Sequence, residues 1–224
     1  MSKIVIIGAG DFPKKEYPRY LVRSADRIIC CDSALRTWLR VMKPLFGRDR
    51  LPDVVIGDMD SLPKTLQKRF SDRIIHITEQ DDNDQTKAMR YVMDHYPDAT
   101  EIHFIGSTGK REDHTVGNMS LLMEYARIWE VTGLPAEGKP VVDMVTDYGT
   151  IFAVTDSCSL PVGEGRRISI FTPDNSLRIK SKGLVWPTDD VVFDNWWKAT
   201  LNRASEDTVT LELSHKSIAL ISLD

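Results

Sequence analysis

Short apolar runs alternate with helix-length segments over the first part of the chain. These runs are rich in Ile and Val and do not alternate with polar residues, which is typical of parallel strands covered on both faces. We expect strands at residues 3–8, 27–31, 53–57, 74–78, 101–106 and 141–146. The rhythm predicts an N-terminal, doubly wound, mainly parallel α/β domain.

Two of the segments between these runs carry apolar residues at helical spacing. Residues 83–96 place Ala88, Met89 and Val92 on one stripe, and Asn83 or the residue before it can cap the helix start. Residues 113–131 likewise gather apolar side chains near one face. We expect two helices whose methionines belong to the core.

The pattern changes after about residue 147. Short apolar segments are now separated by Gly, Pro, Asn and Asp, and no long amphipathic helix remains. We expect strands at residues 150–154, 167–171, 177–179, 191–193, 208–213 and 217–222. Segments of this length and spacing predict a β-sandwich. The chain should therefore have an α/β domain at residues 1–146 and a β-sandwich domain at residues 147–224.

Composition narrows the class of protein. The chain has 224 residues, of which 42% are hydrophobic and 28% are charged, as in ordinary folded proteins. A net charge of −4 leaves no excess positive field for a nucleic-acid backbone. No apolar run approaches the roughly 20 residues of a membrane span or resembles a signal peptide. We expect a cytoplasmic protein that binds neither nucleic acid nor membrane.

Two carboxylates follow the expected strand at residues 53–57. Asp58 and Asp60 would lie at the carboxyl end of a parallel strand, where open α/β sheets bind their ligands. Two carboxylates repel each other by about 4 kcal/mol at about 4 Å and an effective dielectric constant of ~20. Mg²⁺ would relieve this repulsion, since it prefers oxygen ligands together with substrate phosphates. The alternative is that both are turn or capping residues.

A second acidic cluster follows the next expected strand. It contains Glu79, Asp81, Asp82 and Asp84 and leads into a helix. Acidic residues in a first turn also complement the helix dipole, which is an alternative explanation. Because two successive strand ends deliver carboxylates, the sequence predicts one acidic pocket supplied by both.

A third segment, residues 106–114, joins a strand to a long helix. Its glycines would let backbone N–H groups approach phosphates, and Lys110 and Arg111 supply positive charge. It lacks the spacing and the Ser or Thr of a Walker A loop. A phosphate-binding loop is the expectation, and a glycine-containing surface loop is the alternative. The earlier Gly8-Ala9-Gly10 is only a weak match to a dinucleotide fingerprint, because Pro13 stands where a third glycine belongs.

Taken in order, three motifs resemble those of thiamine pyrophosphokinases. They are Gly57-Asp58-Met59-Asp60-Ser61, Asp81-Asp82-Asn83-Asp84-Gln85-Thr86-Lys87-Ala88 and Gly106-Ser107-Thr108-Gly109-Lys110-Arg111-Glu112-Asp113-His114-Thr115. Residues 167–171 and 183–187 resemble segments of the thiamine-binding β domain of that family. The resemblance implies an ATP- and Mg²⁺-binding α/β domain, a thiamine-binding β-sandwich, and a homodimer with its active site between subunits. It also implies transfer of pyrophosphate from ATP to thiamine, which gives thiamine diphosphate and AMP.

The resemblance also assigns roles to residues. The implied metal ligands are Asp58, Asp60 and Asp81, and the implied catalytic acids are these three and Asp113, with Asp60 or Asp113 as general base. The implied substrate-binding residues are Asp84, Lys87, Gly109, Lys110, Arg111, His114, Trp186, which would stack on the pyrimidine ring, and Ser205.

The chain departs from the family pattern at several positions. It has Lys110 in place of the second glycine of a pair, and Asn83, Glu112, Glu206 and residues 32–34 also differ. Two other functions therefore stay open: pyrophosphoryl transfer to another heterocyclic alcohol, such as a hydroxymethylpterin, and a non-catalytic nucleotide- or thiamine-binding module. The β domain with its tryptophan favours thiamine, and the full set of motif acids favours catalysis.

Overall fold

The chain folds into two compact units. The computed structural model describes residues 1–224. One unit, here the α/β unit, comprises residues 1–118 and 144–147, and the other, the β unit, comprises residues 119–143 and 148–224. Helix α5 (Glu112–Trp129) and strand β6 (Val141–Thr146) contribute residues to both units. The domain boundary expected between residues 146 and 147 stays a prediction.

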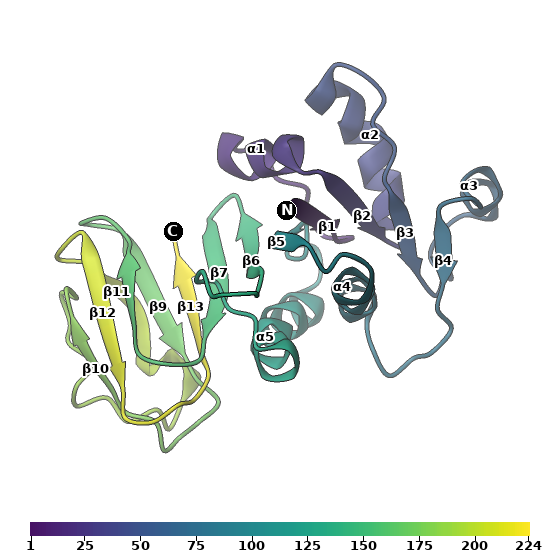
Figure 1. Ribbon diagram of the computed structural model, residues 1–224. Helices are drawn as coiled ribbons and strands as arrows, with labels where there is room; N and C mark the ends of the chain where they lie inside the picture. The colour runs from purple at the N-terminus through teal and green to yellow at the C-terminus, as the bar shows by residue number, and fades with distance from the viewer. The chain divides into compact units, whose positions relative to one another are not determined.

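Five parallel strands form the sheet of the α/β unit (Figure 1). Their order is β5 (Ala99–Ile105), β1 (Ser2–Ile7), β2 (Arg27–Cys31), β3 (Val54–Gly57) and β4 (Ile74–His76). The order of connection reverses at β1, which pairs with β2 on one side and β5 on the other. Ligands of open α/β sheets bind beside such a switch point, at the carboxyl ends of the strands.

Helices cover both faces of this sheet. Figure 1 shows α1 (Glu16–Ser24) and α2 (Ala34–Phe46) on one face and α4 (Asp84–His95) on the other, with the short α3 (Lys64–Arg69) near the β4 edge. This arrangement confirms the expected doubly wound fold. No helix combines the length and the hydropathy that crossing a bilayer would require.

The start of α4 shows why the chain folds this way locally. The Asn83 side chain accepts a hydrogen bond from the Thr86 backbone N–H at 3.0 Å, which satisfies a donor that would otherwise lack a partner in the first turn. Residues 85–89 that follow are all buried. The cap and the buried stripe together fix the position of the first turn of α4 against the sheet.

The β unit is a sandwich of two antiparallel sheets, as expected. One sheet has the order β11 (Ala199–Arg203), β9 (Arg167–Phe171), β13 (Ala219–Leu223) and β7 (Gly149–Val154). The other has the order β10 (Ile179–Lys182), β12 (Thr208–Leu213) and β8 (Cys158–Pro161). Apolar side chains from both sheets form one buried core between them.

Some strand predictions for the β unit were wrong. Residues 191–193 form no strand, although Phe193 is buried in the core and the Val191 N–H donates to the Thr188 carbonyl in a turn. Strands β8 and β11 were missed, and the strand expected at residues 177–179 begins at Ile179. The buried Phe193 explains the first error, because an apolar run can fill a core without pairing in a sheet.

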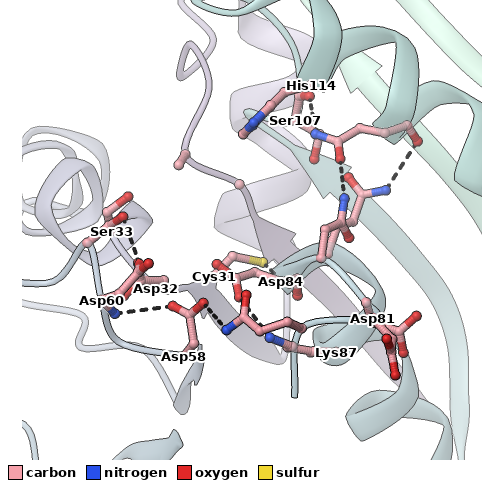
Figure 2. Close-up of a pocket in the computed structure, with 18 residues that line it drawn as sticks. Cys31, Asp32, Ser33, Asp58, Asp60, Asp81, Asp84, Lys87, Ser107 and His114 are labelled. Atoms are coloured by element: carbon pink, nitrogen blue, oxygen red, sulfur yellow. Dashed lines mark hydrogen bonds and ion pairs between the residues drawn. The ribbon is translucent and has the colours of Figure 1, made fainter. Parts of the chain in front are cut away.

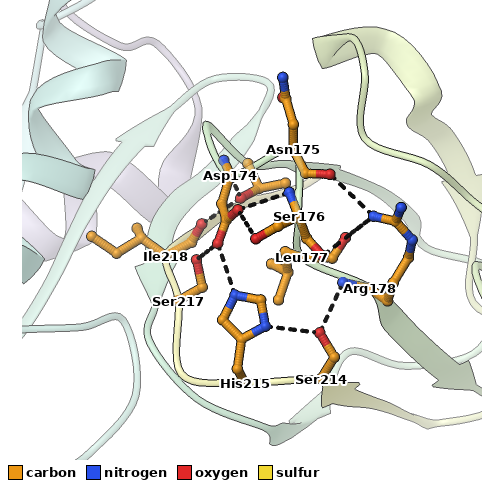
Figure 3. Close-up of polar contacts among 10 residues, drawn as sticks. Asp174, Asn175, Ser176, Leu177, Arg178, Ser214, His215, Ser217 and Ile218 are labelled. Carbon is orange, nitrogen blue, oxygen red and sulfur yellow. Dashed lines mark hydrogen bonds and ion pairs between the residues drawn. The ribbon is translucent and has the colours of Figure 1, made fainter.

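One carboxylate ties together two connections that pass between the sheets (Figure 3). Asp174 lies between β9 and β10, and its Oδ1 accepts from the N–H and hydroxyl of Ser176 at 2.9 and 2.6 Å. Its Oδ2 lies 2.9 Å from Nε2 of His215 and accepts from the Ser217 hydroxyl at 2.8 Å, both between β12 and β13. These hydrogen bonds, with that of Ser176 first, hold the pKa of Asp174 well below its usual range.

Candidate active site

A cavity of about 520 Å³ lies at the carboxyl ends of the parallel strands (Figure 2). Every strand of the α/β sheet contributes residues from the segment that follows it. These are Gly8 and Ala9 after β1; Cys31, Asp32 and Ser33 at the end of β2; Asp58, Asp60 and Ser61 after β3; Gln80, Asp81, Asp82, Asn83, Asp84, Gln85 and Lys87 after β4; and Ser107, His114 and Asn118 after β5. The strand order alone therefore brings these distant segments to one place.

Three carboxylates in the cavity could hold a metal ion. One oxygen each from Asp32, Asp58 and Asp60 lies within 4.8 Å of the other two. Asp32 is 3% exposed, and its Oδ1 is buried without a hydrogen-bond partner. Buried polar atoms are normally paired, so an unpartnered carboxylate oxygen in an acidic cluster fits a cation. An all-oxygen donor set of this kind suits Mg²⁺.

Gly57, the last residue of β3, allows Asp32 and Asp84 to approach the strand. A Cβ at this position would lie 2.8 Å from Oδ1 of Asp84 and 2.9 Å from Cβ of Asp32, and the backbone φ is +153°. Glycine is therefore required on both steric and conformational grounds. Its absent side chain leaves the space in which carboxylates from β2 and α4 meet.

The loop after β3 is held in a strained conformation. Met59 has φ +61°, and Gln67 of α3 donates to the Met59 and Leu62 carbonyls at 2.6 and 2.7 Å. Asp58 accepts from the Gln80 side chain at 3.0 Å and from the Asp60 N–H at 3.1 Å. These two hydrogen bonds lower the pKa of Asp58, so its carboxylate stays ionised and available as a ligand.

Two other carboxyl groups resist ionisation. Burial, followed by the charges of Asp32 and Asp58, raises the pKa of Asp84 to about 6. Burial, followed by the charge of Asp58, also raises the pKa of Asp32. The Lys87 ammonium lies 3.9 Å from Oδ1 of Asp84 and only partly offsets these effects. The cavity therefore concentrates more negative charge than the protein alone neutralises.

The expected phosphate-binding loop packs against the turn after β1. The N–H groups of Gly8, Gly10 and Asp11 donate to the carbonyls of Ile105, Gly106 and Thr108, respectively. Lys110, with φ +63°, donates from Nζ to the Ala9 carbonyl at 2.5 Å. Gly8 and Ala9 of the weak glycine motif line the cavity.

The structure brings some expected site residues together and leaves others outside the cavity. Asp58, Asp60, Asp81, Asp84, Lys87 and His114 all line it. Figure 2 shows Asp81 apart from the cluster of Asp32, Asp58 and Asp60. Gly109, Lys110, Arg111 and Asp113 are not among the lining residues, and Asp113 is paired with Arg111 at 2.5 Å.

The two expected residues of the β unit lie on its surface. Trp186 is 57% exposed and borders a groove of about 320 Å³ with Pro187, Leu201 and Asn202 among its other lining residues. The buried Asn202 fixes the Trp186 backbone, donating to its carbonyl at 2.6 Å and accepting from its N–H at 3.2 Å. Ser205 is exposed, and its N–H donates to the Gly183 carbonyl.

Sequence reasoning missed Asp32 as a candidate metal ligand. The sequence does contain a signal for this residue, because Asp32 directly follows the apolar strand β2, as Asp58 follows β3. A single carboxylate after a strand is weak evidence until its neighbour in the sheet is known. The pairing of β2 with β3 places Asp32 beside the Asp58 loop.

Comparisons with known proteins agree with this fold. The chain is 31% identical over 85 residues to "Thiamine pyrophosphokinase 1" of Oryza sativa subsp. japonica, a segment that covers 34% of this chain and 32% of that relative. Thus the match spans about a third of the curated relative.

Solved structures resemble the chain over nearly its whole length. The thiamine pyrophosphokinase of Bacillus subtilis has a TM-score of 0.74 at 19% identity, with 99% of each chain covered. That of Candida albicans has a TM-score of 0.74 at 17% identity, with 99% of this chain and 90% of that chain covered. At these identities the likeness shows the fold.

Two family models match the sequence. Residues 18–131 match "Thiamin pyrophosphokinase, catalytic domain", and residues 149–219 match "Thiamin pyrophosphokinase, substrate-binding domain". The first match alone spans half of the chain and includes the cavity-lining residues at the end of β2 and those that follow β3, β4 and β5. The chain therefore belongs to the thiamin pyrophosphokinase family.

Proposed function

We propose that the chain transfers a pyrophosphoryl group from ATP to the primary hydroxyl of thiamine, giving thiamine diphosphate and AMP. The observation that carries this proposal is the convergence of carboxylates from β2, β3 and α4 in one cavity at the sheet's switch point. Pyrophosphoryl transfer depends on positioning and charge stabilisation and requires no covalent intermediate. An acidic cavity that needs a cation suits that chemistry.

Asp32, Asp58 and Asp60 would hold Mg²⁺, with Asp81 as a further ligand candidate in the same cavity. When bound, the ion would neutralise charge on the ATP phosphates. The low pKa of Asp58 and the unpartnered Oδ1 of Asp32 support these two residues as ligands.

The transfer step requires no reactant other than ATP and thiamine. The thiamine hydroxyl oxygen forms a bond to the β-phosphorus, and the bond from that phosphorus to the oxygen bridging the α-phosphate breaks, so that AMP leaves. The hydroxyl proton passes to a carboxylate. Asp60 is favoured over Asp113 because Asp60 lines the cavity, whereas Asp113 is paired with Arg111 and does not.

Positive and donor groups around the cavity would bind the nucleotide. Lys87 and His114 line it, and Asp84 lies beside Lys87. The loop that carries Gly109, Lys110 and Arg111 would cradle phosphate through its backbone and charge. Lys110 acts through the Ala9 carbonyl in this structure, so we assign it to holding the loop in place.

The β unit would bind thiamine. Trp186 is exposed beside a groove and backed by Asn202, which makes it a rigid aromatic platform for a cationic ring, and Ser205 would contribute nearby. In this proposal residues 1–146 serve ATP and Mg²⁺ and residues 147–224 serve thiamine. The enzyme would be a cytoplasmic homodimer with its active site between subunits.

The deciding experiment identifies the released nucleotide. Pure protein is incubated with ATP, Mg²⁺ and thiamine, and the nucleotide products are separated by chromatography. AMP and thiamine diphosphate in equal amounts support the proposal, whereas ADP would indicate simple kinase chemistry and refute it. A parallel reaction with a hydroxymethylpterin tests the other acceptor class.

Two variants test the site. Asp58→Asn should reduce AMP formation by at least about a hundredfold, because a metal ligand is lost while the shape is kept. Asp72→Asn is the matched control, since Asp72 is 73% exposed and lies outside the cavity. Near-normal activity of Asp58→Asn would remove this carboxylate from the mechanism.

A further inference from the structure

The charges that line the acidic cavity are strongly unequal. Six carboxyl groups line it, and Lys87 is the one lysine or arginine among the lining residues. The six are Asp32, Asp58, Asp60, Asp81, Asp82 and Asp84. A single ammonium in such a field influences any ion that enters.

Lys87 is placed to act through its charge. It lies in the first turns of α4, and its side chain is 2% exposed. Its Nζ is 3.9 Å from Oδ1 of Asp84, which is beyond hydrogen-bond distance but within reach of charge attraction. The effect of this charge reaches beyond Asp84, since it contributes to lowering the pKa of both Asp58 and Glu79.

Burial of this ammonium is unfavourable for the fold alone. An ionised group removed from water carries a large desolvation penalty, and apolar side chains of similar volume often serve stability as well or better. Lys87 also borders a second groove lined by apolar and charged side chains alike, among them Ile75, Ile77, Glu79 and Arg90, so a neutral side chain at this position would still have apolar neighbours. The stability of the fold therefore does not account for a charged side chain at this position.

We propose that the Lys87 ammonium is a fixed counter-ion that weakens divalent-metal binding by the carboxylate cluster and strengthens nucleotide binding in the same cavity. A resident positive charge repels an incoming dication and attracts phosphates. The cluster would then release its metal readily as a complex with the nucleotide. The nucleotide half of this inference rests on the proposed function, whereas the metal half does not.

The test measures Mn²⁺ binding to the metal-free protein by electron paramagnetic resonance of free Mn²⁺, without nucleotide. Lys87→Met should lower the Mn²⁺ Kd roughly fivefold, the effect of one unit charge on a divalent ion across a solvent-screened gap. Lys87→Arg keeps the charge and should stay within about twofold of wild type. Lys68→Met removes an exposed lysine outside the cavity and should change nothing.

A charge-balanced variant separates charge from packing. Lys87→Met combined with Asp84→Asn removes one charge of each sign, so its Mn²⁺ Kd should return toward the wild-type value. Lys87→Gln provides a second neutral side chain, and circular dichroism verifies folding. Unchanged or weaker Mn²⁺ binding in a folded neutral variant, or an equal shift in Lys87→Arg, overturns the inference.

Nucleotide binding is measured separately with ATP and no metal. Lys87→Met should raise the ATP Kd roughly fivefold, and an unchanged Kd would overturn the nucleotide half. Neither measurement depends on turnover. Failure to form AMP from thiamine and ATP would therefore count against the proposed function and leave the metal half standing.

Discussion

Asp84→Asn should stabilise the metal-free protein at neutral pH. The pKa of Asp84 rises from 3.8 to about 6, chiefly through burial and then through the charges of Asp32 and Asp58. At about 1.36 kcal/mol per pH unit, keeping this group ionised in the folded state costs about 3 kcal/mol. Since 30% of the side chain is exposed, solvent screening reduces this cost to about 2 kcal/mol.

The sign of the pH dependence follows from the two pKa values. The folded-state pKa lies above the unfolded-state value, so the unfolded chain releases the proton first as the pH rises. Stability is unaffected by this group below about pH 4, falls between about pH 4 and 6, and carries the whole penalty above about pH 6. Asparagine stays neutral and avoids the penalty at every pH.

The assay is thermal unfolding in EDTA at pH 4.0 and pH 7.5. A gain of about 2 kcal/mol in a chain of this size corresponds to a Tm about 4–8 °C higher at pH 7.5, and the difference should nearly vanish at pH 4.0. Mg²⁺ should narrow the gap at pH 7.5 by stabilising wild type more than the variant. An equal Tm difference at both pH values, or a lower Tm of Asp84→Asn at pH 7.5, would refute the reasoning.

Three further predictions concern other parts of the chain. Gly57→Ala should lower the unfolding free energy by about 1–3 kcal/mol and weaken Mn²⁺ binding, because the new Cβ would lie 2.8 Å from Oδ1 of Asp84. Gly47→Ala is the control, since Gly47 also has a positive φ of +68° but a Cβ there would meet no atom within 4 Å. This control should lose only about 1 kcal/mol in thermal unfolding and leave Mn²⁺ binding unchanged. Asp174→Asn should lower the unfolding free energy by about 1–2 kcal/mol near pH 7 through lost hydrogen bonds. This difference should begin to shrink as the pH falls below about 4 and should be lost only as the pH passes through the lowered pKa of Asp174. Trp186→Ala should raise the KM for thiamine about tenfold with little change in kcat, and an unchanged KM would remove Trp186 from the thiamine site.

The α/β half was largely predictable because its local signals agree. Apolar strands, a capped helix at Asn83 and acids directly after strands each have a physical reason that a sequence displays. Asp32 was missed because its significance depends on the pairing of β2 with β3. Likewise, the sequence shows no sign that Asp113 would turn to Arg111 and away from the cavity.

The β half was harder because its strands are short and irregular. β11 contains Leu201, which is 82% exposed with φ +58°, and the pairing of β11 with β9 shifts register around it. Such a strand does not show clean alternation. The segment around Phe193 led to the opposite error. Its apolar residues predicted a strand, whereas Phe193 fills the core next to a turn.

Three costs to the fold coincide at the acidic cavity. Asp32 adopts a left-handed backbone conformation with φ +33°, the pKa of Asp84 rises to about 6, and an oxygen of Asp32 is buried without a partner. Each feature destabilises the protein by itself, and all three lie at residues that line the cavity. A bound cation would satisfy the unpartnered oxygen and offset the repulsion at once. Sites that violate the rules of stable folding in this concerted way are expected where function imposes the geometry, which argues that the ligands of this cavity have determined its structure.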